Sequence, residues 1–174
     1  MQAIQTSIIR RQFIAGAIAL TTVATASAPA IAQDKTIVLG VLGAFAGPFA
    51  ADAVEGYNGA LLAAKEINAA GGVDGYMFDV QQFDTREMTP DAVLAAVERL
   101  KATPNLGAIV TPFGSLSGFE MEYVADIGVP YMVAANYNQY RSIIQEDPDK
   151  FSNVWSLAPS YDAYQTELPF VIKE

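Results

Sequence analysis

The sequence predicts an α/β domain built on a parallel sheet with helices on both faces. Short apolar runs, typical of strands buried on both sides, alternate with longer segments that show helical periodicity. The hydrophobic fraction is 52%, which is enough for a packed core, and residues 33–174 suit one domain. Strands that alternate with helices form parallel sheets through right-handed crossovers.

The first predicted unit is a strand, a helix and a second strand. Residues 37–42 form a continuous apolar run, and a loop of small residues follows at 43–51. Asp52 and Glu55 have the spacing of a capping box, which predicts that a helix begins there. Residues 76–83 alternate as a strand does. The apolar stripe expected on the helix comprises Val54, Tyr57, Leu61 and Ala64.

The second predicted unit begins with a helix that has Thr89 as its N-cap and Pro90 in its first turn. A short buried strand is expected at 108–110. Ser117 and Glu120 form a second capping box, which predicts the next helix. The apolar stripe of the first of these helices comprises Val93, Ala96, Val97 and Leu100.

The last part of the chain adds two predicted strands and a helix. The strands lie at 129–134 and 154–157, and residues 136–153 are interpreted as a long polar loop between them. Trp155 is expected in the core because its strand is apolar. Residues 161–174 show a helical pattern.

Residues 1–32 predict an export signal. Arg10 and Arg11 precede an uncharged apolar run that ends in an A-x-A site at Ala32. We expect cleavage near Ala32, so that residues 33–174 function in the periplasm. The arginine pair fits either a twin-arginine signal or a general export signal.

The composition excludes several classes of function. The chain contains no cysteine and no histidine, which rules out a thiolate nucleophile, a Ser-His-Asp triad and the commonest metal ligands. It has neither a phosphate-binding glycine motif nor a G-x-S-x-G elbow. The net charge of −9 disfavours nucleic-acid partners. We therefore expect no enzyme activity, no metal and no cofactor.

The candidate site lies where the strands end, because ligands of open α/β sheets bind outside the carboxyl ends of the strands. Three loops leave those ends, at 43–51, 112–117 and 135–138. Ser115 and Ser117 place hydroxyl groups at a helix N-terminus, which attracts anions. Because Ser117 is the predicted helix cap, Ser115 is the freer of the two and is expected to bind the ligand.

Three further residues are candidates that also have a structural explanation. Asn136 and Tyr137 suit an adaptable pocket, and they suit a plain surface loop equally well. Asp52 would suit a cationic group, but its place in the capping box already explains it, which favours the structural role.

Four motifs resemble the branched-chain amino-acid binding proteins, which are type I periplasmic binding proteins of ABC importers. They are GAFAGP at 43–48, EINAAGGV at 66–73, TPFGS at 111–115 and GVP at 128–130. Their order and spacing agree with that family over 37–172. The resemblance implies two α/β lobes that close over a ligand by a hinge. Family members are longer, so the chain is expected to hold a truncated first lobe.

The resemblance also implies roles for individual residues. The serine that matches Ser115 binds the α-carboxylate of the ligand, and the positions of Ala135 and Tyr137 help to hold its ammonium and carboxylate groups. Tyr137 replaces the usual serine or threonine, and Asp52 is aligned where the family has a loop aromatic. These departures leave an amino acid, or another small polar or carboxylate-bearing compound, as the expected ligand.

The resemblance implies a binding protein that delivers its ligand to an inner-membrane ABC permease. A periplasmic sensor on the same scaffold is the alternative, and a small exported α/β enzyme is less favoured because histidine and cysteine are absent. A transcriptional regulator is disfavoured by the export signal and the acidic charge.

Overall fold

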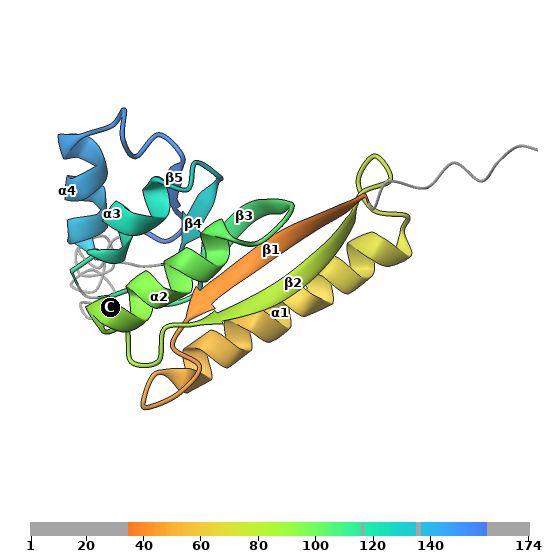
Figure 1. Cartoon of the computed structure of the whole chain (residues 1–174), viewed down its shortest axis with the longest axis horizontal. Coiled ribbons are helices and arrows are strands. Elements are labelled where there is room, and N and C mark those ends of the chain that lie inside the picture. The colour runs from red at the N-terminus through yellow and green to blue at the C-terminus, as the bar shows by residue number, and fades with distance from the viewer. Residues whose placement is uncertain (1–34, 116, 135–136, 160–174) are drawn as a thin grey trace, which may run out of the picture. The chain divides into compact units, whose positions relative to one another are not determined.

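The computed structural model describes residues 35–115, 117–134 and 137–159. The predicted export signal at 1–32 and the predicted helix at 161–174 lie outside these ranges. Strands and helices alternate through the described chain (Figure 1). They are β1 (Thr36–Gly43), α1 (Ala50–Ala69), β2 (Met77–Asp84), α2 (Pro90–Lys101), β3 (Leu106–Thr111), α3 (Glu120–Ala125), β4 (Tyr131–Val133), α4 (Asn138–Glu146) and β5 (Val154–Ser156).

The strands form one sheet in the order β2-β1-β3-β4-β5. Every neighbouring pair is parallel, which confirms the predicted fold class. Because the strands are parallel, all their carboxyl ends lie at the same edge of the sheet. The loops that follow β1, β2, β3 and β4 are therefore brought to one side of the domain. None of the described helices is long and apolar enough to cross a membrane.

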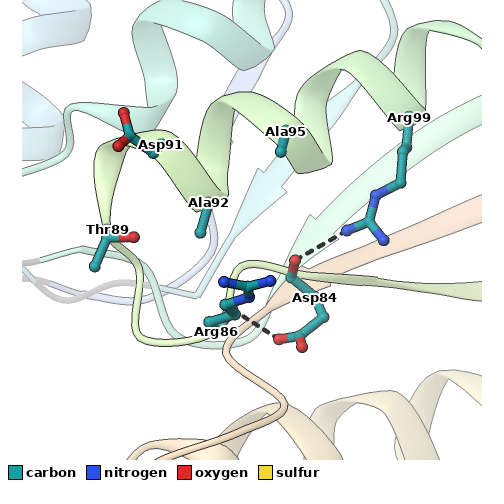
Figure 2. A pocket seen from close by; sticks show the side chains of 7 residues that line it. All are labelled: Asp84, Arg86, Thr89, Asp91, Ala92, Ala95 and Arg99. Atoms are coloured by element: carbon teal, nitrogen blue, oxygen red, sulfur yellow. Dashed lines mark hydrogen bonds between the residues drawn. The ribbon is translucent and has the colours of Figure 1, made fainter.

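Asp84, at the end of β2, connects two of these loops. Its Oδ1 accepts hydrogen bonds from the backbone N–H of Phe45, at 3.0 Å, and of Arg86, at 2.7 Å. Arg99 of α2 donates to the Asp84 carbonyl oxygen at 2.9 Å (Figure 2). One carboxylate thus ties the loop after β1 to the loop after β2, and an arginine ties both to α2.

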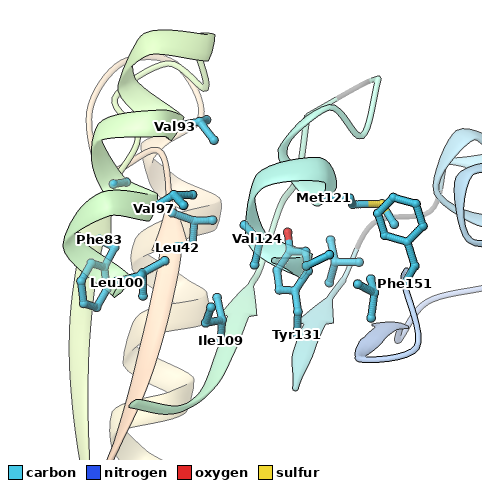
Figure 3. Packing of buried hydrophobic residues seen from close by; sticks show 14 of the residues in the cluster. Leu42, Phe83, Val93, Val97, Leu100, Ile109, Met121, Val124, Tyr131 and Phe151 are labelled. Carbon is cyan, nitrogen blue, oxygen red and sulfur yellow. The ribbon is translucent and has the colours of Figure 1, made fainter. Parts of the chain in front are cut away.

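The larger part of the core lies between the sheet and the helices α2 and α3 (Figure 3). The predicted stripe of α2 is confirmed, since all four of its residues are buried. They pack with Leu42, Ile109 and Tyr131 from the strands and with Val124 from α3. Burial of this continuous apolar surface is the main stabilising term for the domain.

Helix α1 covers β1 and β2 on the other face, and its predicted stripe is confirmed in part. Ala64 is buried and Tyr57 packs against the same small core cluster, whereas Val54 and Leu61 are 41% and 39% exposed. Ala53, which was not predicted, is buried as well. Small residues face the sheet because the helix approaches it closely: a Cβ on Gly43 of β1 would lie 3.0 Å from Cβ of Ala53. Gly56 likewise lies close to Pro112 in the loop after β3, where a Cβ would lie 2.3 Å from the proline Cγ.

The predicted capping box of α1 is wrong. The helix begins at Ala50, its N-cap position is Phe49, and no side chain caps it. Its far end is held by Asn68, whose side chain exchanges two hydrogen bonds of 2.8 Å with the backbone of Phe78 in β2.

The predicted loop at 136–153 contains α4, which is a correction. Tyr140 is completely buried on this helix and belongs to the larger core cluster, and Ile143 and Ile144 pack against that cluster. One buried aromatic residue in a polar segment thus anchors the helix to the sheet. The sequence hides it because most of the segment remains exposed.

Trp155 lies in β5, as expected, but it is 59% exposed and does not belong to the core. The register places Val110, Met132 and Trp155 in one row across β3, β4 and β5. Helix α1 packs on β1 and β2, and β3, β4 and β5 lie progressively farther from it. The side chains of Val110 and Met132 are partly buried, and that of Trp155, at the far end of the row, is exposed. Helix α4 contacts β5, and Val154, whose side chain points to the opposite face from Trp155, packs in the same core cluster as Tyr140 of that helix.

Candidate ligand-binding site

Three hollows lie on the carboxyl-end side of the sheet. The first, of about 590 Å³, lies between the end of β2 and α2, and exposed charged residues of both signs line it, among them Arg86, Asp91 and Arg99. The second, of about 440 Å³, adjoins it and shares Asp84, Arg86 and Thr89 with it. The third, of about 420 Å³, is lined by the loops after β1, β2, β3 and β4. We take the third as the candidate site, because apolar pockets with a few polar groups at strand ends are the usual ligand sites of this fold class.

Aromatic rings form the apolar part of this pocket. Phe49 stacks on Phe113 with ring centroids 5.6 Å apart, and Phe113 meets Tyr137 edge to face at 6.3 Å. Tyr137 in turn stacks on Tyr140 at 6.4 Å. Phe49, Phe113 and Tyr137 line the pocket directly. Rings fixed against one another lose little conformational freedom when a ligand packs on them.

Ser115 forms the polar part, and it is held by Glu120. The Ser115 N–H donates to Glu120 Oε1 at 2.9 Å, and the Ser115 hydroxyl donates to Glu120 Oε2. The N–H of Gly118 donates to Ser115 Oγ at 2.9 Å. The prediction that Ser117 pairs with Glu120 and leaves Ser115 free is therefore wrong. Ser117 is exposed, while Ser115 is only 9% exposed.

Glu120 and Tyr140 complete a buried polar network below the pocket. Glu120 is completely buried, and the Tyr140 hydroxyl contacts its Oε1 and also donates to the Ser115 carbonyl oxygen at 3.0 Å. A Cβ on Gly114 would lie 2.0 Å from the Tyr140 hydroxyl, so this position requires glycine. Among the described residues, every buried side-chain nitrogen and oxygen has a hydrogen-bond partner.

Two buried phenols flank this network. Burial raises the pKa of Tyr140 and of Tyr131, and the nearby charge of Glu120 raises the pKa of each further. Tyr131 donates to Thr111 Oγ1 at 3.0 Å. Both phenols are therefore neutral hydrogen-bond donors at physiological pH.

The structure brings some of the predicted site residues together. Ser115 and Tyr137 both line the pocket. Asp52 is exposed in the first turn of α1 and does not belong to the pocket lining. Ala135 and Asn136 lie outside the described residues.

Sequence reasoning missed the phenylalanine residues of the pocket. Phe49, not Asp52, supplies the ring from the loop after β1, and it packs on Phe113. A signal was present, since each phenylalanine directly follows a proline in a loop at a strand's carboxyl end. Glu87, Met88 and Phe119 also line the pocket and were not predicted.

The charges of the pocket limit what it can bind. Glu87 contributes a carboxylate, and no lysine or arginine belongs to the lining. The described part of the chain also holds no group of three or more side chains arranged to bind a metal. The geometry suits a small organic molecule that places an apolar or aromatic part on the rings and a polar group at Ser115.

Comparison with known proteins gives a consistent family. The family model described as "Periplasmic binding protein" matches residues 36–171. A protein of Silicibacter pomeroyi assigned as a branched-chain amino acid ABC transporter is 28% identical, with a TM-score of 0.71 over 79% of this chain and 35% of its own length. A type 1 periplasmic binding protein of Bordetella pertussis is 25% identical, with a TM-score of 0.56 over 72% of this chain and 34% of its own.

A Desulfitobacterium hafniense ABC transporter substrate-binding protein in complex with Leu shares the fold at 22% identity, with a TM-score of 0.53 over 79% of this chain and 38% of its own. The chain thus spans little more than a third of the length of these structures. No curated protein matches the chain. The family match covers most of the sequence, and the parallel sheet and the strand-end pocket agree with it, so the chain belongs to the periplasmic binding protein family.

Proposed function

We propose that this chain forms the ligand-contacting part of an extracytoplasmic solute-binding protein that delivers a small molecule to an inner-membrane ABC permease. The observation that carries the proposal is the aromatic pocket of about 420 Å³ with Ser115 in its lining, at the carboxyl ends of four parallel strands. The family match and the likeness to the Silicibacter pomeroyi protein support it. Export by residues 1–32 and a periplasmic location belong to the same proposal.

The pocket supports a ligand of the size of an amino acid. Its volume lies at the low end of the range for small-molecule sites. Phe49, Phe113 and Tyr137 favour an apolar or aromatic body, and Ser115 favours a polar group at one end. An amino acid with an apolar side chain, or a related small polar or carboxylate-bearing compound, fits this description.

The second side of the binding site is expected from outside this chain. The matched structures are much longer, and the chain covers 35% of the Silicibacter pomeroyi protein. Solute-binding proteins of this architecture close by a hinge, so that contacts from both sides stabilise the closed form. A ligand held from one side keeps contact with water, and we therefore expect weak binding by this chain alone.

Nuclear magnetic resonance suits weak binding and reports on single residues. Amino acids, amides, carboxylates and aromatic acids would be added at millimolar concentration to the labelled chain. We expect shifts at the amide signals of Gly114, Ser115 and Gly118, which lie in and beside the pocket. Phe113→Ala should abolish them. Leu62→Ala is the matched control, because Leu62 is a 58% exposed apolar residue of α1 outside the pocket. Absence of shifts with every class of compound would refute the proposal.

A further inference from the structure

Glu120 places the chain's own carboxylate against Ser115. The backbone N–H of Ser115 donates to Oε1, and its hydroxyl proton is directed at Oε2. These are the donors that a ligand carboxylate would need at this serine. In this structure they are already used by a side chain that is completely buried.

A count of protons and lone pairs shows what Ser115 can still offer. A serine hydroxyl has one proton and two lone pairs. The proton is given to Glu120, and one lone pair accepts the N–H of Gly118 at 2.9 Å. One lone pair remains, so toward a ligand the hydroxyl of Ser115 is an acceptor. A carboxylate can only accept hydrogen bonds, whereas an amide, an alcohol or an ammonium group can donate one.

The charges around Ser115 act in the same direction. Within the described chain, no lysine or arginine forms an ion pair with Glu120, whose partners are Ser115 and Tyr140. Glu87 adds a second carboxylate to the pocket lining. A ligand carboxylate at Ser115 would stand beside these negative charges without a compensating cation, which disfavours it.

The network is built into several positions of the sequence. Gly114 leaves room for the Tyr140 hydroxyl, which a Cβ would approach to 2.0 Å, and for Glu120 Oε1, which it would approach to 2.7 Å. Tyr140 comes from α4, on a different segment from Ser115 and Glu120, and fixes the carboxylate from the far side. Glu120 therefore has no free space into which it can turn away from Ser115 without disturbing this packing.

We propose that Glu120 determines the specificity of the pocket: it selects against ligands that present a carboxylate to Ser115 and for ligands that present a hydrogen-bond donor there. This inference rests on the proposed function and narrows its ligand class to amides, alcohols or amines with an apolar or aromatic body. Glu120 acts through Ser115 and is a positioning residue, since it does not itself line the pocket.

The test compares two probes of matched shape, phenylacetamide and phenylacetate, and a second pair, leucinamide and leucine. Dissociation constants are measured by titration of the labelled chain. For the unmodified chain we expect each amide to bind at least about tenfold more tightly than its carboxylate, the factor that about 1.4 kcal/mol represents. In Glu120→Gln, which keeps the shape and removes the charge, we expect this ratio to fall by about tenfold.

Glu122→Gln is the matched control. It removes the same charge from the same helix, but Glu122 is exposed and pairs with Lys150 away from the pocket. Its amide-to-carboxylate ratio should equal that of the unmodified chain. The ratio is the decisive readout, because a merely structural role of Glu120 would weaken both probes alike.

Two results would contradict the inference in different ways. Carboxylates that bind the unmodified chain as tightly as amides, with an unchanged ratio in Glu120→Gln, would overturn it and leave the proposed function standing. No shift of the pocket signals with any probe or compound class would overturn the proposed function and this inference together. If Glu120→Gln does not fold, an unmodified chain that binds carboxylates as tightly as amides still overturns the inference.

Discussion

Replacement of Ser115 by alanine tests the buried network through stability. The substitution removes Oγ, which accepts from the Gly118 N–H at 2.9 Å and donates to Glu120 Oε2. Both partners are buried, so each loses a hydrogen bond without gaining water. An unsatisfied buried group costs about 1–3 kcal/mol. Two such groups predict a loss of about 2–6 kcal/mol in the free energy of unfolding.

Ser117→Ala is the matched control in the same loop. Ser117 is exposed, and exposed substitutions without special contacts change stability by less than about 0.5 kcal/mol. Local capping rules predict the reverse order, because Ser117 and Glu120 have the capping-box spacing. The two variants therefore separate the local pattern from the observed contacts.

Urea denaturation followed by circular dichroism measures both variants. The slope of the free energy against urea should stay constant, so that the change lies in the midpoint. A Ser115→Ala variant within about 0.5 kcal/mol of the unmodified chain would refute the network as described. A larger loss in the free energy of unfolding for Ser117→Ala than for Ser115→Ala would support the capping box of Ser117 and Glu120 instead.

Three further predictions concern pH, packing and affinity. Tyr131 and Tyr140 have raised pKa values, so only the unfolded chain loses their protons just above pH 10. The contribution of the two phenols to the free energy of unfolding should be fully present below about pH 10 and fall above it by up to about 1.4 kcal/mol per pH unit for each phenol. Urea denaturation across this pH range measures the change, and a flat profile would contradict the prediction. Gly114→Ala should cost about 1–3 kcal/mol because its Cβ meets the Tyr140 hydroxyl, whereas Gly59→Ala, with nothing near its Cβ, should be neutral or stabilising; equal effects would refute the close approach. Calorimetry on the chain should detect no ligand binding tighter than about 1 mM, and micromolar binding would show that one side of the site suffices.

Local sequence patterns were enough to predict the helices and strands that are buried in the same way along their whole length. The α2 stripe, the strands and the parallel order were predictable, because a helix buried along one side and strands buried on both faces leave regular apolar periods. The start of α2 was predictable as well: Thr89 occupies the N-cap position, although its side chain makes no capping hydrogen bond, and Pro90 lies in the first turn, where its fixed backbone angle suits a helix.

Elements whose environment varies along their length were not predictable in this way. The side of α1 that faces the sheet is decided by close packing, in which Ala53 lies against Gly43 of β1 and Gly56 lies against Pro112, so that small residues lie there in place of Val54 and Leu61. The exposure of Trp155 depends on whether a helix covers its face of the sheet, a property of the assembly rather than of β5.

For the candidate site, too, one part was predictable from the sequence and another was decided by the tertiary structure. The sequence alone located it at the strand ends and named Ser115 and Tyr137, because chain order and parallel topology determine which loops meet. The role of Ser115 was decided by tertiary structure. Tyr140, 25 residues away, packs over the loop and directs Glu120 toward Ser115 instead of Ser117. The capping-box rule considers only residues within one helical turn. The buried carboxylate of Glu120 instead takes the position in which the folded chain supplies it with hydrogen-bond donors.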